Sequence, residues 1–147
     1  MFEDFTWEWN EESWGITHKS LLNLRSSILD GWQDEIDIVS VCSDKEREIL
    51  GYAIINKTRE TITYTGDGFR TDFKGEGGAG YKTAHAFLSI LGIKRSRLEI
   101  FPVIEDETYI ETDIFKQRLQ NMLEDNLEDL SFFIPREIKT VEYLRDI

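Results

Sequence analysis

The segment from Thr61 to Gly92 constrains the fold most, because its pattern changes from that of a strand to that of a helix across a glycine-rich stretch. Ile62 and Tyr64 alternate with threonines, which predicts a half-buried β-strand. From Tyr81 onward one apolar stripe recurs at helical spacing, at Ala84, Phe87, Leu88 and Leu91. The stretch from Gly66 to Gly80 interleaves glycines with charged residues, and we expect a long loop there.

The remaining patterns predict strands and helices on both sides of this segment. Alternating or continuous apolar runs predict strands near residues 5–9, 35–42, 49–56, 61–66 and 97–103. The short polar link at 57–60 predicts a hairpin, so the three middle strands form an antiparallel meander. Helical spacing predicts a helix capped by Thr17 and ending near Gly31, and a short closing helix after Pro135. A further helix, capped by Thr112 or Asp113, would bury Phe115, Leu119, Met122, Leu123, Leu127 and Leu130.

This order of elements predicts an α+β fold, with an antiparallel-dominated sheet of about five strands and about three to four helices packed on it. The 147 residues, of which 40% are hydrophobic, suffice for one globular domain with its own core. We therefore predict a single domain over residues 1–147.

The charge balance limits the possible partners. There are 17 basic and 29 acidic side chains, and the formal net charge is -12, which disfavours nucleic acid and anionic membranes and favours a basic partner. Cys42 is the only cysteine, which fits a reducing compartment. The first residues are acidic, unlike a secretory signal, and no apolar run reaches membrane-spanning length. We expect a cytoplasmic protein.

Few residues have a spacing typical of catalysis or metal binding. His18 and His85 are far apart in sequence, and Cys42 within an apolar strand is typical of an inert small hydrophobe, although a Cys42–His85–carboxylate arrangement stays open. Acidic residues of the glycine-rich stretch could hold a hard cation, but they do not match an EF-hand. We predict no metal site, no cofactor and no catalytic residue, and favour a protein that is not an enzyme.

The glycine-rich stretch has two open interpretations. Backbone amides at Gly77, Gly78 and Gly80, with Lys82 nearby, could bind an anion at a helix N-terminus. Alternatively, the glycines only let the chain turn and the helix pack closely. The run Phe73–Gly80, with Leu91–Ile93 and Leu98–Ile100, resembles the acyl-CoA-binding core of GNAT-type acetyltransferases, which implies a cofactor bound at Gly77 to Gly80.

Acidic residues gather in clusters that local stability does not require. Within the predicted third helix, Glu124 precedes Glu128 by four positions and Asp125 precedes Asp129 by four, so like charges would repel near the negative end of the helix dipole. Two further groups comprise Glu105, Asp106, Glu107 and Glu111, and Asp34, Glu35 and Asp37. A solvated face that keeps the protein soluble is the alternative explanation of any one cluster.

A small, acidic, cysteine-poor chain of this kind resembles the immunity proteins of bacterial polymorphic and contact-dependent toxin systems. The resemblance includes the run Asp67–Arg70, Asp72, and the run from Gly75 to Tyr81. It implies a non-enzymatic inhibitor that occludes a basic, nuclease-type toxin. The predicted partner-binding residues are Asp67, Arg70, Asp72, Glu76, Glu105, Asp106, Glu107, Glu124, Asp125, Glu128 and Asp129.

Overall fold

The computed structural model describes residues 1–9, 16–42, 49–70, 75–91, 96–98, 104–105, 108–109 and 111–134. The helices are α1 (Thr17–Asp30), α2 (Gly75–Ile90) and α3 (Thr112–Asp125), and a 3-10 helix (Leu127–Asp129) follows α3. The strands are β1 (Thr6–Trp9), β2 (Ile36–Cys42), β3 (Ile49–Asn56), β4 (Thr61–Tyr64), β5 (Phe69–Arg70), β6 (Ser96–Leu98), β7 (Ile104–Glu105) and β8 (Thr108–Tyr109). The predicted α+β class is confirmed.

The main sheet is mixed rather than purely antiparallel. β2, β3 and β4 form the predicted antiparallel meander, and the two-residue β5 also pairs antiparallel with β3. β1 pairs parallel with β4 and β6 pairs parallel with β2, which gives the order β1-β4-β3-β2-β6. Parallel neighbours need a long connection, and the chain between β1 and β4 contains α1 while that between β2 and β6 contains α2.

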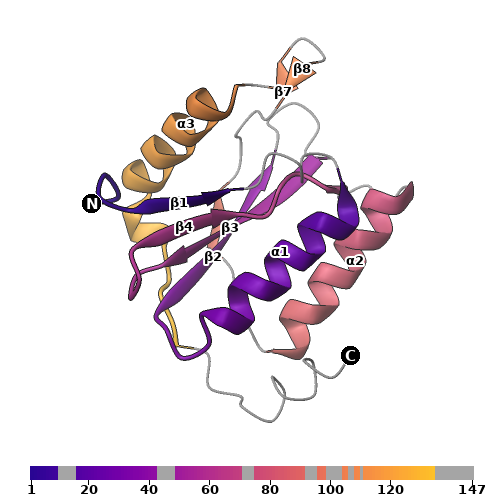
Figure 1. The fold of residues 1–147 in the computed structure, drawn as a ribbon, viewed down its shortest axis with the longest axis horizontal. Helices are drawn as coiled ribbons and strands as arrows, with labels where there is room; N and C mark the ends of the chain where they lie inside the picture. The colour runs from indigo at the N-terminus through magenta and orange to yellow at the C-terminus, as the bar shows by residue number, and fades with distance from the viewer. Residues whose placement is uncertain are drawn as a thin grey trace.

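The sheet lies between two helical layers (Figure 1). Ile38 and Ile54 point toward α1 and α2, whereas Val39 and Ile55 point toward α3, because successive side chains of a strand face opposite sides. The core on the first face comprises Leu24, Ile28, Ile36, Ile38, Tyr52, Ile54, Phe69, Ala84, Leu88 and Leu91. The core on the second face comprises Phe2, Val39, Val41, Ala53, Ile55, Ile62, Tyr64, Phe115, Leu119 and Leu123.

The last part of the glycine-rich stretch, from Gly75 to Gly80, is helical, which corrects the prediction of a loop as far as Gly80. α2 begins at Gly75, so Gly77, Gly78 and Gly80 lie inside its first turns. The short strand β5 occupies part of the remaining stretch. Glycine disfavours a helix interior, and tertiary packing overrides that preference here.

α3 is shorter than predicted. It ends at Asp125, and Leu127 in the following 3-10 helix is 39% exposed, so the expectation that Leu127 lies on the buried side was wrong. The predicted capping side chains were also wrong. Ile16 and Glu111 occupy the N-cap positions of α1 and α3, and neither makes a side-chain capping hydrogen bond.

The segment after the 3-10 helix runs back along β2. Ile36 and Phe133 exchange two backbone hydrogen bonds of 2.8 and 2.9 Å. The backbone N–H of Ser131 donates to Oδ2 of Asp37 at 3.0 Å, and Asp37 is fully buried. Asp37, expected in an acidic surface cluster, is therefore a structural acceptor. The predicted closing helix after Pro135 and residues 99–103 of the predicted last strand lie outside the described residues.

Candidate functional site: a polar groove beside helix α1

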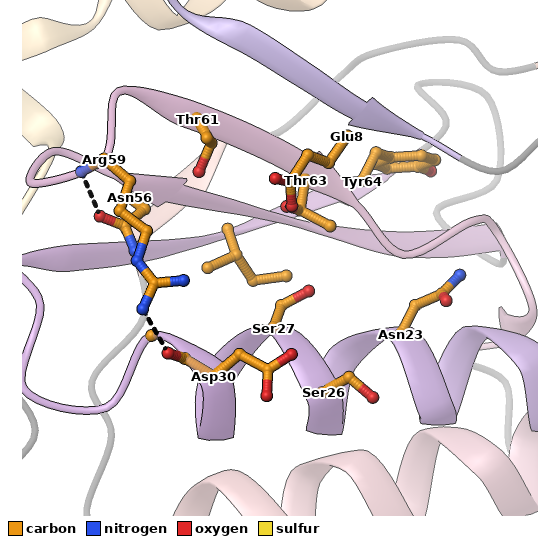
Figure 2. A pocket seen from close by; sticks show the side chains of 12 residues that line it. Glu8, Asn23, Ser26, Ser27, Asp30, Asn56, Arg59, Thr61, Thr63 and Tyr64 are labelled. Atoms are coloured by element: carbon orange, nitrogen blue, oxygen red, sulfur yellow. Dashed lines mark hydrogen bonds between the residues drawn. The ribbon is translucent and has the colours of Figure 1, made fainter.

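A groove of about 350 Å³ lies between α1 and the part of the sheet formed by β1, β3 and β4 (Figure 2). Its lining is mainly polar, with Ile54 as an apolar contribution from the sheet. The hydroxyl and amide side chains are those of Asn23, Ser26, Ser27, Asn56, Thr61 and Thr63. The charged side chains are those of Glu8, Asp30 and Arg59.

The periodicities of two elements create this lining. In β4, Ile62 and Tyr64 are buried on the α3 side, so Thr61 and Thr63 are half-buried on the other face. In α1, Leu24 and Ile28 enter the core, and a neighbouring polar stripe at i, i+3, i+4 and i+7 lines the groove. That stripe consists of Asn23, Ser26, Ser27 and Asp30.

A hydrogen-bonded network holds one end of the groove in place. The Arg59 guanidinium forms an ion pair with Asp34, with 2.8 Å between Nε and Oδ2, and donates from Nη2 to the backbone carbonyl of Asp30 at 2.7 Å. Asn56 donates from Nδ2 to Asp34 at 2.9 Å and accepts from the Arg59 backbone N–H at 2.9 Å. Asp34, a member of one of the acidic groups seen in the sequence, is therefore paired with a cation inside the protein.

Both walls of the groove present hydrogen-bond acceptors. Glu8 accepts a 3.3 Å hydrogen bond from the Thr63 hydroxyl through Oε2. Asn23 donates from Nδ2 to the Thr65 carbonyl at 3.1 Å, which leaves its amide oxygen as an acceptor beside the groove. Glu8 and Asp30 are both exposed, and neither carboxylate has an ion-pair partner within the described ranges.

None of the predicted partner-binding residues lines this groove. Asp67 is only 5% exposed, Arg70 is partly buried, and Glu76 is exposed in the first turn of α2, where the helix dipole favours a carboxylate. Glu105 lies in β7, and Asp72, Asp106 and Glu107 lie outside the described residues. β7 and β8 precede α3 and lie beyond its N-terminal end, whereas Asp125 and the 3-10 helix lie at its C-terminal end (Figure 1).

The glycines proposed for a cofactor are used at least partly for packing. A Cβ at Gly80 would collide with Cγ2 of Thr17 on α1, and one at Gly77 would lie 2.9 Å from Cγ of Arg70. Gly78 is buried as well. Lys82 is exposed on α2, next to the Tyr81 ring, whose centroid is 6.0 Å from that of His85. The interpretation of the glycines as packing residues is thus supported at Gly80.

The acidic residues at the end of α3 differ in environment. Glu124 accepts a hydrogen bond from the Phe2 backbone N–H at 3.3 Å and lies 3.6 Å from the Met1 amine. A hydrogen bond to Glu3, with a smaller contribution from Glu124, raises the pKa of that amine, and the amine lowers the pKa of Glu3. Because α3 ends at Asp125, the predicted pairs at i and i+4 do not lie within one helix.

Glu124 and Asp125 make a matched pair of variants on the same turn. Glu124→Ala is expected to lower the free energy of unfolding by about 1 kcal/mol, because it removes the acceptor for the Phe2 N–H. Asp125→Ala is expected to be neutral or to stabilise by about 0.3 kcal/mol, because a carboxylate at a helix C-terminus opposes the dipole. Urea unfolding would measure both. Equal losses for the two would show that Glu124 has no structural role of its own.

The groove residues Glu8, Asp30 and Arg59 are not among the site residues predicted from the sequence. The polar stripe of α1, which has the same spacing as an apolar core stripe, could have indicated Asp30. Its partner wall needs the parallel pairing of β1 with β4, which local patterns do not reveal.

The chemistry that this part of the molecule offers is binding through hydrogen bonds and charge. Among the described residues, no group of three His, Cys, Asp or Glu side chains could hold a metal ion. Of the helices described, none is long and apolar enough to cross a membrane. Comparisons of the chain with protein-family models, curated proteins and solved structures found no match.

Proposed function

We propose that this chain is a non-enzymatic binding protein that neutralises a basic, nuclease-type toxin by covering its active site or substrate surface. The observation that carries the proposal is the acidic end of α3. Asp125, Glu128 and Asp129 are exposed, and the last turn of α3 contains no basic residue. A formal net charge of -12 adds a field that attracts cations.

These carboxylates are unfavourable for the free molecule. The C-terminal end of a helix carries partial negative charge, so the Asp125 carboxylate costs about 0.3–1 kcal/mol of stability compared with a neutral residue. Glu128 and Asp129 follow within the next turn and add like charge. A cationic surface that covers this segment would offset the repulsion.

The physical mechanism would be steering followed by occlusion. Complementary charge raises the association rate. Salt reduces this gain, because exposed charges interact only over about one Debye length, ~10 Å at 0.1 M salt. Slow dissociation then requires a few well-packed contacts at the centre of the interface.

The test is binding to a panel of basic nuclease domains, with inhibition of nuclease activity as the second readout. For a domain that binds, reversing Asp125, Glu128 and Asp129 to lysine is expected to slow association by about ten- to a hundredfold at low salt. The matched control reverses three other exposed carboxylates, Asp4, Glu60 and Glu111, and so changes the net charge equally.

Equal effects of the two triple variants would show that the acidic end of α3 is not a contact surface. Failure to find any basic domain that binds would remove the proposal. The alternative is a small GNAT-like acyltransferase or an anion- or nucleotide-binding domain that uses Gly77, Gly78, Gly80 and Lys82. A thermal shift with acetyl-CoA or a nucleotide would favour it, because a ligand of the native state raises the unfolding midpoint.

A further inference from the structure

We propose that the groove beside α1 binds a guanidinium group, carried by an arginine side chain of the basic partner. This inference rests on the proposed function for the source of the arginine. The groove itself is argued from its shape, charge and hydrogen-bonding groups.

The space is concave and lies between regular elements. Its volume of about 350 Å³ falls within the range of small-ligand sites, so one long side chain can enter it. Its walls are the 14-residue helix α1 and the hydrogen-bonded strands β1, β3 and β4. Such walls hold their side chains more precisely than loops do.

The charge of the groove favours a cation. Glu8 projects from β1 on one wall and Asp30 from the end of α1 on the other (Figure 2). Asp30 also lies where the dipole of α1 is negative, and the last turn of α1 contains no basic residue. The one cation in the lining, Arg59, is held by the Asp34 carboxylate, so its charge is offset. Phosphates and carboxylates would be repelled from this lining.

The hydrogen-bonding groups favour a guanidinium among cations. A guanidinium carries five N–H donors in one plane and needs acceptors around its rim. The Glu8 and Asp30 carboxylates, the amide oxygen of Asn23 and the hydroxyls of Ser27 and Thr63 provide acceptors from both walls (Figure 2). Arg59 already places its guanidinium against the C-terminal carbonyl of α1, at 2.7 Å from Asp30 O. This contact shows that the end of α1 accommodates the group.

The direct test is an NMR titration of the full chain with the methylamide of acetyl-arginine. The matched control ligand is the methylamide of acetyl-citrulline, which has the same shape without the charge. We expect the arginine compound to shift the backbone amides of Ser27, Gly31 and Thr63, and to bind about tenfold more tightly than the citrulline compound. Equal affinity for the arginine and citrulline compounds would mean that charge is not recognised, and it would overturn the assignment. Chemical-shift changes confined to another surface would overturn it as well.

The second arm uses variants that keep the shape of the groove. Glu8→Gln with Asp30→Asn is expected to weaken binding of the arginine compound about tenfold, because two partly exposed ion pairs are lost. Asp4→Asn with Glu111→Gln changes the net charge equally at exposed sites outside the groove and is expected to stay within about twofold. Equal weakening by the two pairs would assign the effect to the overall field and reject the groove.

The outcomes separate this inference from the proposed function. If the arginine compound binds in the groove but no basic nuclease domain binds the chain, the groove assignment stands and the proposed function fails. If a basic domain binds and the Glu8→Gln, Asp30→Asn variant holds it unchanged, the proposed function stands and the groove is not its contact.

Discussion

Replacing Phe115 by alanine is expected to lower the free energy of unfolding by about 3–5 kcal/mol, the usual cost of truncating a buried aromatic residue. Phe115 is fully buried on the inner side of α3, and its ring centroid lies 4.8 Å from that of Tyr64 in β4. The loss combines apolar surface that is no longer buried with a cavity between α3 and the sheet. Urea unfolding followed by circular dichroism would measure it.

The control for Phe115 is the preceding residue. Ile114 is 45% exposed on the same helix. Ile114→Ala is therefore expected to change the free energy of unfolding by less than about 0.5 kcal/mol, because the higher helix propensity of alanine offsets part of the lost contacts. A similar loss at both positions would mean that α3 does not pack on the sheet through the Phe115 side.

Gly80→Ala is expected to destabilise the protein by about 1–2 kcal/mol, although alanine is the better helix former. The new methyl group would collide with Cγ2 of Thr17, where α2 packs against α1. Thr17 is buried, and its hydroxyl donates to the Gly68 carbonyl at 2.7 Å, which holds the side chain in place. Overpacking costs about 1–3 kcal/mol, and the gain in helix propensity of about 1 kcal/mol offsets only part of it.

Thr17→Ser makes this prediction specific, because serine keeps the hydroxyl and removes the colliding methyl group. Gly80→Ala is expected to cost about 1 kcal/mol less in the Thr17→Ser background than in the wild type. Gly77→Ala is the second comparison: its Cβ would lie 2.9 Å from Cγ of Arg70, a milder contact than that at Gly80, and we expect a change below about 1 kcal/mol. Additive effects of Gly80→Ala and Thr17→Ser would reject the proposed contact.

The Gly80 result also bears on function. If position 80 requires glycine because α1 and α2 pack closely there, this glycine is no evidence for a phosphate-binding loop. Its backbone N–H lies beyond the first four residues of α2, where intrahelical hydrogen bonds use such groups. Only amides near Gly75 to Gly78 remain at the helix start, beside the carboxylate of Glu76.

The candidate site was far less predictable than the fold. Exposed and buried carboxylates look alike in a sequence, so the predicted partner-binding residues include both Asp67, which is buried, and Asp125, which is exposed. The acidic i and i+4 pairs require a helix that continues through Asp129, whereas α3 ends at Asp125. Helix ends depend on the balance of capping and tertiary contacts, and apolar periodicity marks them poorly.

Local sequence alone determined the elements that bury a strong periodic pattern. The meander of β2, β3 and β4, the body of α1 and the core side of α3 through Phe115, Leu119 and Leu123 all follow from residues that are close in sequence. Only the tertiary structure decided the parallel edges, the helical course of the Gly75 region and the groove between Glu8 and Asp30. Those features join segments that are distant in the chain, and their free energy comes from contacts that no local pattern contains.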